Sequence, residues 1–393
     1  MDAFNWHNGT FLKMDIIIVI LFIILINAFI IKALSNNFEI SSESYLWVLF
    51  IVHFLLTIAY ILYAYFTASD SVNYYDKTIQ SENWLAFFQT GTQFINFLAW
   101  PFVVLLGLKY YATMIVFSYF GYLAIVLFYI TTKENVKLNA IWQNYTAIEL
   151  LFLLPNLHFW SSSLGKGSSI LFGLGLFIYG LSRFNKRIFS LLIGGLLTFF
   201  IRPHIFFTLM LSVMIGTLIT SSGIKPYLKW LIFLLAMVVF IYISDDVLKF
   251  ADVDSFDITN SETIMHRATE LGKSSSGVNI QEYGIAMKMF TFWFRPLFFD
   301  GQGLFGFIVS FENLLYLYMF FIFIKEGFLT WNKWNGWFRI CLFIFFLGSF
   351  ILAQVSGNLG IAMRQKAQFM PFFFILYCKA ISYRESSRNA ISI

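Results

Sequence analysis

Several cationic side chains interrupt or border long apolar runs, so anion binding is the first chemistry to consider. Arg202 stands in FFIRPHIFFT, Arg295 in FWFRPLFFDG, and Arg364 with Lys366 in GIAMRQKAQFM. A guanidinium grips phosphate oxygens through paired donors, and a charge left at a helix centre in the bilayer costs about 2.5–3.5 kcal/mol. The residues that we assign to a cleft for a diphosphate or another anionic substrate are Arg202, Arg295, Arg364, Lys366, Lys166, His204 and Arg267. The alternative is that each cation reaches the lipid headgroups.

Arg202 is expected at a corner between two spans. Pro203 lacks a backbone donor and suits the first turn of a helix, so a helix should begin there. Arg295 and Pro296 repeat the pairing. His204, one turn into the new helix, can add a donor or serve as a structural histidine. RPH therefore predicts a hairpin corner near the outer membrane surface.

Two carboxylates could remove a proton from a sugar hydroxyl, and a third stands deeper in the membrane. Asp70 and Asp76 lie in SDSVNYYDK, where they are either catalytic or the solvated face of an outer loop. Glu312 lies two to three turns into an apolar span, and a carboxylate at that depth should face a cavity or a cation. We expect Arg295 or Arg364 to be its partner.

The stretch LLPNLHFWSSSLGKG combines a helix-breaking Pro155 with three consecutive serines and Lys166. The serines at 161–163 can cap the following helix. Alternatively, the freed backbone N–H groups and Lys166 form an anion-binding nest at a helix N-terminus. The pattern is not a P-loop, because GxxxxGK[ST] is absent.

Composition places the chain among membrane proteins. Of 393 residues, 59% are hydrophobic and only 12% are charged, against about 25% in a soluble domain. The two cysteines lie inside apolar runs without metal-ligand spacing, so we expect neither a disulfide nor a metal, and no cofactor. The net charge of +5 comes without a basic stripe of interleaved aromatics, which argues against nucleic acid as a partner. The first apolar stretch lacks a basic leader and a cleavage site, so it is expected to be a retained helix.

The expected fold is all-α: one integral membrane domain over 1–393, a polytopic bundle of about 11 spans. Short breaks rich in Lys and Arg at 183–187, 223–229, 325–339 and 383–388 belong to the cytoplasm by the positive-inside rule. These cytoplasmic assignments are consistent with one another only if 84–108 does not cross the membrane but is a re-entrant or interfacial segment. The N-terminus is then outside and the C-terminus inside. The break at 244–302 is then an extracytoplasmic loop that ends in an interfacial stretch. The expected spans are about 14–31, 45–66, 110–131, 145–159, 167–183, 187–201, 203–222, 228–244, 303–325, 336–355 and 367–381.

The succession of LPNLHFWSSSLGKGSS, IRPHIFFTLMLS, FRPLFFDGQGLFGFIVSFENLLYL and GNLGIAMRQKAQFMPFFFIL resembles bacterial polysaccharide polymerases of the Wzy-like and EpsG-like kind and related GT-C-type transferases. The likeness covers roughly 67–380. It implies glycosyl transfer between repeat units on undecaprenyl diphosphate, outside the inner membrane, without metal. It also implies that the cations hold the diphosphate while Asp70, Asp76 or Glu312 supplies the base, with a chain-length regulator and a flippase as partners. Only Arg295 and Gly306 show the Arg-x10-Gly spacing associated with Wzy polymerases.

Two other functions remain open at this point. A GT-C-type enzyme would move one sugar from a polyprenyl monophosphate and would depend on Asp70 or Asp76 rather than on the arginines. A transporter or flippase-like subunit would line a passage with the cations, but such proteins commonly show paired halves. The sequence shows no internal repeat, and its polar residues gather on one face.

Overall fold

The structure is a computed structural model, and it describes residues 14–37, 42–67, 69–139, 145–220, 282–300 and 303–391, with shorter pieces at 141, 225, 227–231, 234–235, 238, 277–278 and 280. In this described part the chain forms helices and no named strand, which confirms the all-α expectation. One isolated bridge joins Gly277 to Asn358.

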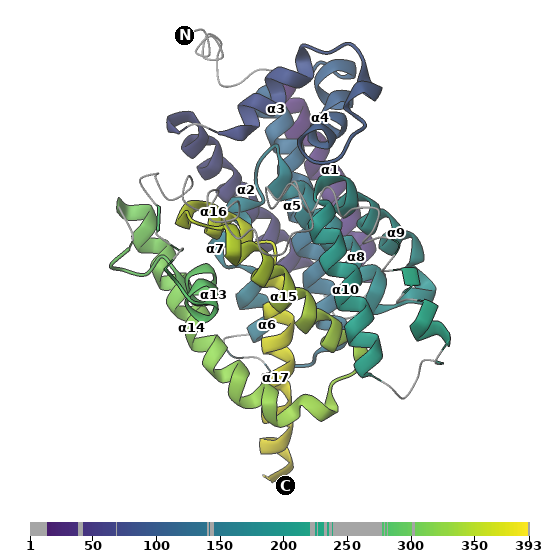
Figure 1. The fold of residues 1–393 in the computed structure, drawn as a ribbon. Coiled ribbons are helices and arrows are strands. Elements are labelled where there is room, and N and C mark those ends of the chain that lie inside the picture. Colours follow the sequence, from purple (N-terminus) through teal and green to yellow (C-terminus); the bar gives the residue numbers. More distant parts are fainter. Residues whose placement is uncertain are drawn as a thin grey trace.

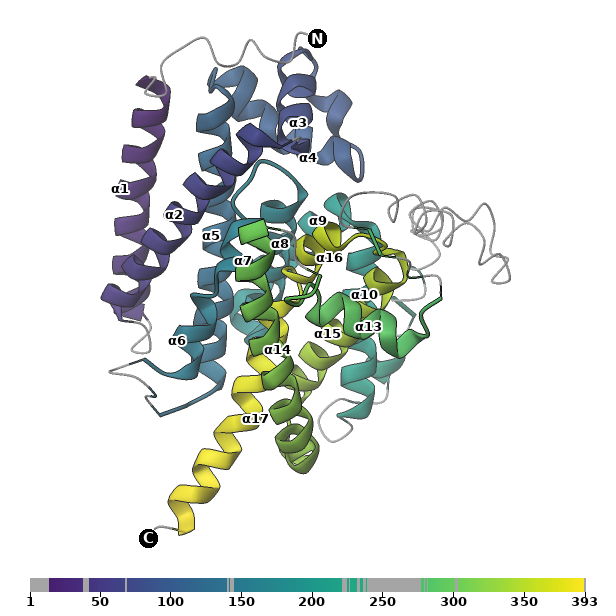
Figure 2. The same ribbon diagram turned by 90° about the vertical axis from the view of Figure 1, so that its left-hand side faces the viewer.

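The first two helices form a hairpin beside a third. Helix α1 (Met14–Asn37) turns into α2 (Glu43–Phe66), and Lys32 pairs with Glu43 at 3.1 Å across the turn. Asp15 accepts a hydrogen bond from the backbone N–H of Lys109, at the start of α5 (Tyr110–Asn135). The end of α2 and the start of α5 therefore lie at the end of the bundle where α1 begins (Figure 2).

The chain between α2 and α5 stays at that end, as the charge pattern predicts. It contains α3 (Asp70–Ile79), η2 (Trp84–Phe87), α4 (Thr92–Trp100) and the π-helical turn η3 (Pro101–Leu105). Trp84, Phe97 and Trp100 stack within it. The Gly91 N–H donates to the Phe200 carbonyl at 2.7 Å, which fixes the segment against the end of α9.

The expected span at 145–159 is wrong, because it is two short helices. Thr146 and Glu149 form a capping box that starts α6 (Ala147–Phe152), and Pro155 starts α7 (Pro155–Trp160). Pro155 cannot donate to the preceding turn, so the helix cannot continue through it. Each piece has six residues, about 9 Å of helix, which is too short to cross a bilayer alone.

Three antiparallel helices follow: α8 (Lys166–Ser182), α9 (Phe184–Ile201) and α10 (Pro203–Ile219). Small residues let α8 and α9 approach closely. A Cβ added to Gly194 would lie 2.4 Å from the Phe177 backbone nitrogen, and one on Gly180 would lie 2.4 Å from that of Leu191. The α8–α9 hairpin is therefore tightly built before it reaches Arg202.

The C-terminal part consists of α13 (Ile285–Phe294), α14 (Gly303–Thr330), η4 (Trp331–Lys333), α15 (Gly336–Val355), α16 (Leu359–Lys366) and α17 (Met370–Ile391). Figure 1 shows α14, α15 and α17 side by side, with the short α16 above them. Aromatic rings fill the space between these helices, with Phe345 stacked on Trp293 at 5.2 Å and on Phe373 at 5.3 Å.

The Lys- and Arg-rich breaks meet at one end of the bundle, which we name the basic end. Arg187, at the α8–α9 turn, makes a two-pronged ion pair with Glu134 at the end of α5. Arg339, at the start of α15, donates to the Ile219 carbonyl at the end of α10. Tyr383 of α17 donates to the carbonyl of Lys333. The opposite end carries α3, α4 and the α9–α10 corner (Figure 2).

Six helices in the described part are long and apolar enough to cross a membrane, and they mark the chain as a membrane protein. The expected count of about 11 spans is not confirmed by these six helices. Helices α8 and α10 have 17 residues each, which is short for a span, and the expected span at 145–159 is broken. Most of the expected span at 228–244 and of the loop at 244–302 lies outside the described residues. The six helices are Met14–Asn36, Glu43–Phe66, Tyr110–Asn135, Phe184–Ile201, Gly306–Lys333 and Gly336–Val355.

Candidate functional site

The corner between α9 and α10 is built as predicted. Arg202 is at once the C-cap of α9 and the N-cap of α10, which begins with Pro203. Its backbone leaves helical geometry there (φ −148°, ψ 87°), and its carbonyl accepts the first hydrogen bond of α10, from Ile205. The side chain of Arg202 is half-buried, and His204 in the first turn of α10 is buried.

Arg364 reaches the same end of the bundle from α16. The Asn358 side chain caps this eight-residue helix by accepting from the Ile361 N–H. One Arg364 Nη donates to an Asp70 carboxylate oxygen at 2.8 Å, at the start of α3. The Asp70 side chain is 60% exposed and that of Arg364 is 24% exposed. The carboxylate of Asp70 is therefore open to solvent, whereas most of the Arg364 side chain is covered by the protein.

Both arginines lie within electrostatic range of Tyr74. This tyrosine lies one turn after Asp70 on α3 and is buried. Burial and the Asp70 carboxylate raise the pKa of the Tyr74 hydroxyl, while the guanidiniums of Arg364 and Arg202 and a hydrogen bond with Thr92 lower it. A charge shifts a pKa in this way only from nearby. Arg202 and Arg364, 162 residues apart in sequence, therefore act on one phenol.

The 161–165 turn brings the start of α8 to this cluster. Gly165 has a φ of 155°, a conformation that other residues rarely adopt, and a Cβ there would lie 3.2 Å from the Tyr74 ring and 3.8 Å from an Arg364 nitrogen. Lys166 follows as the first residue of α8. We name Asp70, Tyr74, Arg202, Gly165 with Lys166, and Arg364 the arginine cluster.

The serines before this turn do not cap α8, contrary to expectation. Gly165 is the cap residue, with no side-chain hydrogen bond. Ser161 donates to the Leu157 carbonyl and Ser162 to the carbonyl of His158, both one turn back in α7. The hydroxyls are used by α7 because its last turn has free carbonyls within their reach.

Arg295 belongs to a neighbouring arrangement. Its guanidinium donates to both carboxylate oxygens of Asp300, at 2.8 and 2.5 Å, and to the Tyr283 hydroxyl at 3.3 Å. The side chains of Arg295 and Asp300 are only 13% and 6% exposed. Two parallel charged hydrogen bonds are the strong form of this interaction. The Arg295–Pro296 peptide bond is cis.

Lys366 holds the backbone of the same segment. This lysine is fully buried, and its Nζ donates to the carbonyls of Trp293 (3.2 Å) and Arg295 (3.1 Å) and to the Asn313 Oδ1 (2.5 Å). An ammonium has three donors, so these three oxygens match its capacity. Burial lowers the pKa of Lys366 to about 7, against the attraction of Glu312. Lys366, which follows Arg364 by two residues, thus holds the backbone of the 293–296 segment in place.

Glu312 does not pair with Arg295 or Arg364, so that expectation is wrong. Its carboxylate accepts from the Asn156 backbone N–H at 3.0 Å and from the Tyr316 hydroxyl one turn later. Arg295 pairs with Asp300 and Arg364 with Asp70 instead. The cation that acts on Glu312 is Lys366.

The remaining predicted residues lie elsewhere. Asp76 follows Asp70 by six residues, about 120° around α3, and acts with Asp15 on Tyr75, whose pKa burial and these carboxylates raise to about 12. Arg267 lies outside the described residues.

Sequence reasoning missed two contributors. Tyr74 was not predicted as a site residue, since a tyrosine in a polar stretch has no distinctive signature. Asp300 could have been found, because FRPLFFD places it five residues after Arg295.

No group of three or more His, Cys, Asp or Glu side chains that could hold a metal occurs among the described residues. Cys341 and Cys378 are free and buried. No family model, no curated protein and no solved structure matches this chain.

Proposed function

We propose that the chain is a membrane glycosyltransferase that polymerises oligosaccharide repeat units carried on undecaprenyl diphosphate, at the outer face of a bacterial inner membrane. The observation that carries the proposal is the Arg364–Asp70 ion pair next to Tyr74, with the guanidinium of Arg202 within electrostatic range of the same phenol. Two guanidiniums from different helices suit a ligand with two phosphates. The cluster also lies at the end opposite the basic end, which the positive-inside rule assigns to the cytoplasm.

In the proposed reaction, the bond between the sugar C1 and the diphosphate oxygen breaks while the acceptor hydroxyl oxygen bonds to C1. The diphosphate leaves with the bonding electrons, so negative charge grows on it. Arg202 and Arg364 stabilise that charge, because donors fixed in advance favour the transition state over the substrate. Lys166 and the start of α8 add a further positive end.

Asp70 supplies the base in this scheme. In the free protein its carboxylate occupies a guanidinium nitrogen of Arg364. A phosphate oxygen competes for the same nitrogen, and its binding leaves the exposed carboxylate free to take the proton of the acceptor hydroxyl. Arg295, Lys366 and Glu312 support the frame of the site, because their polar atoms already have partners inside the protein.

The test is complementation of a deletion strain with Arg202→Gln and Arg364→Gln. We expect surface polysaccharide that lacks long chains while single repeat units persist, with the protein present at its normal level in the membrane. Arg183→Gln is the matched control, since Arg183 carries the same charge at the basic end. Normal chain length in both cluster variants, or in the deletion strain itself, would rule the proposal out.

A second candidate is a transferase that adds one sugar from a polyprenyl monophosphate. It is favoured by the exposure of Asp70, the carboxylate of the cluster. Asp70→Asn separates the two functions. An altered repeat-unit composition in this variant supports the single-sugar transferase, whereas shortened chains of unchanged repeat units support the polymerase, whose flippase and chain-length regulator would then be its working partners.

A further inference from the structure

A pair of histidines lies inside the bundle, away from the arginine cluster. His53 stands in the middle of α2 and His158 on α7, and both are almost fully buried. Their Nδ1 atoms are 3.0 Å apart, a hydrogen-bond distance, and their ring centroids are 5.2 Å apart. Two ring nitrogens can meet at this distance only if one of them carries a proton.

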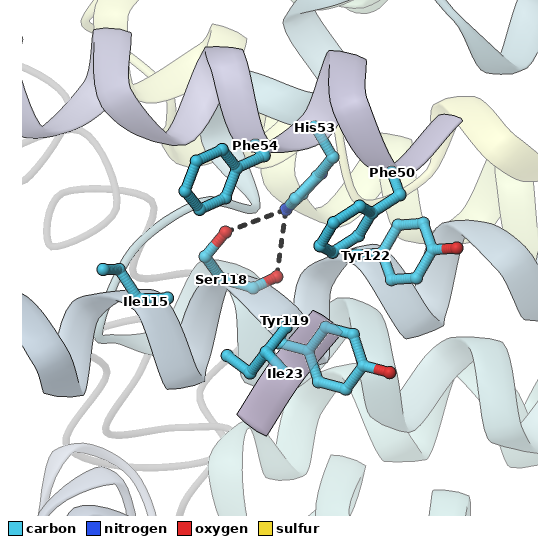
Figure 3. A pocket seen from close by; sticks show the side chains of 8 residues that line it. All are labelled: Ile23, Phe50, His53, Phe54, Ile115, Ser118, Tyr119 and Tyr122. Carbon is cyan, nitrogen blue, oxygen red and sulfur yellow. Dashed lines mark hydrogen bonds between the residues drawn. The ribbon is translucent and has the colours of Figure 1, made fainter. Parts of the chain in front are cut away.

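The partners of the two Nε2 atoms determine which ring nitrogens carry protons. His158 Nε2 lies 2.8 Å from the Phe152 carbonyl, so this nitrogen donates and His158 Nδ1 is an acceptor. His53 must therefore donate through Nδ1. Its Nε2 faces both the carbonyl (2.9 Å) and the hydroxyl (3.0 Å) of Ser118 on α5, as Figure 3 shows.

Ser118 satisfies His53 Nε2 in either protonation state. If this nitrogen carries a proton, it donates to the Ser118 carbonyl, and His53 is then a cation with both nitrogens protonated. If it does not, the Ser118 hydroxyl donates to it and His53 is neutral. In the first case the hydroxyl can turn to Thr57 Oγ1, which lies 2.5 Å away and itself can donate to the His53 carbonyl.

We propose that His53 and His158 form a binding site for one proton, with the Ser118 hydroxyl as the group that turns when the proton enters or leaves. Both states satisfy the ring nitrogens without moving a heavy atom. The entering proton binds His53 Nε2. The proton already on the Nδ1–Nδ1 bond can then lie on either ring, so the positive charge is shared by the pair, and the Ser118 and Phe152 carbonyls face the two ends of the resulting cation. A buried charge needs such dipoles on every side.

Among the described residues, no charged side chain acts on the two histidines. The elements packed on His53 contribute Tyr119 and Tyr122 of α5, both uncharged, and the facing part of α1 is apolar. On α2 itself, Tyr60 lies about two turns along, within the influence of Arg364. Tyr45 lies two turns the other way, and its hydroxyl donates to the backbone carbonyl of Glu149. A cavity of about 10 Å³ beside His53 and Ser118 has room for one water, which can carry the proton (Figure 3).

The site is independent of the proposed glycosyl transfer, and nuclear magnetic resonance of the full chain tests it. In protein with ¹⁵N-labelled histidine, we expect the two rings to bind one proton between them from pH 9 to pH 4, and to show ¹⁵N–¹⁵N coupling across their Nδ1 atoms. His53→Gln and His158→Gln assign the signals. Two separate one-proton titrations, no titration, or no coupling would each overturn the proposal.

Ser118→Ala is the sharper variant. It removes the hydroxyl that serves the neutral state and leaves the carbonyl that serves the cation. The midpoint of the shared titration should therefore rise, by about half to one pH unit if one hydrogen bond is lost. Ser212→Ala is the control, because Ser212 is equally buried and bonds only within α10. A titration midpoint in Ser118→Ala that is unchanged or lower contradicts the role of the hydroxyl. The ¹⁵N–¹⁵N coupling in the unsubstituted protein tests the hydrogen bond between the two histidines separately.

Discussion

Replacing Lys366 by methionine should remove a pH dependence of stability. The fully buried amine has a pKa of about 7 in the folded protein, lowered by burial from 10.5. The unfolded chain therefore holds a proton between these two values that the folded chain gives up. When the unfolded state binds more protons, the free energy of unfolding rises with pH.

The size of the effect follows from the same two values. One pH unit corresponds to about 1.4 kcal/mol for a full proton. From pH 6 to pH 9 the folded lysine changes from mostly charged to neutral while the unfolded one stays mostly charged. The free energy of unfolding should rise by roughly 2–3 kcal/mol over this range. Methionine keeps the apolar bulk but cannot titrate.

The substitution also has a cost that does not depend on pH. The carbonyls of Trp293 and Arg295 and the Asn313 oxygen lose their donor. An unsatisfied buried acceptor costs about 1–3 kcal/mol. This loss lowers the free energy of unfolding of the variant by the same amount at every pH, so it adds no pH dependence.

The measurement is thermal unfolding of the detergent-solubilised full chain, followed by tryptophan fluorescence between pH 6 and pH 9. The difference in melting temperature between the unchanged protein and Lys366→Met should grow by a few degrees as pH rises. Lys288→Met is the matched control, because it replaces the same residue type and the Lys288 amine contacts the Gln354 side chain. A constant difference for Lys366→Met would refute the assignment of a lowered pKa to this lysine.

Two further predictions concern the frame. Asp300→Asn should lower the free energy of unfolding by roughly 2–4 kcal/mol, because it leaves the buried Arg295 without a charged partner. Burial alone would raise the pKa of Asp300, but hydrogen bonds from Arg295 lower it below its ordinary value of 3.8. The loss should therefore shrink as the pH falls through the lowered pKa, and a difference in the free energy of unfolding that does not shrink as the pH is lowered from 7 contradicts the prediction. Gly121→Ala should abolish folded protein on size-exclusion chromatography, because the new Cβ would lie 2.0 Å from the Ser161 backbone oxygen, while Gly284→Ala, which meets nothing within 4 Å, should behave normally.

Local rules predicted the parts of the fold that depend on neighbours in sequence. Pro203 starts α10 at the expected position because a missing N–H and a fixed φ act on the residue itself. The expectation that 84–108 stays at the end of the bundle where α2 ends came from the Lys and Arg residues in the breaks between the apolar runs. The span at 145–159 failed because hydropathy counts apolar residues, whereas Pro155 breaks the helix however apolar its surroundings are.

The partners of the charged residues were beyond sequence reasoning for a different reason. An arginine can pair with any carboxylate that the fold brings near, and only packing decides which. Arg364 pairs with Asp70 from 294 residues away, and His53 meets His158 across 105 residues. No spacing rule relates such positions, since the contacts depend on how α2, α3, α7 and α16 are packed.

Helix α16 shows how one short element can serve both the site and its support. Two cations stand two positions apart on it, about 200° around the helix, so they face different neighbours. Lys366 points inward, where a compact ammonium suits three oxygens. Arg364 points to the arginine cluster, where a planar guanidinium can hold Asp70 and still present a second nitrogen. Exchanging the two residue types should then damage both tasks: Arg364→Lys loses the paired donors, and Lys366→Arg places a larger cation in a space built for one nitrogen.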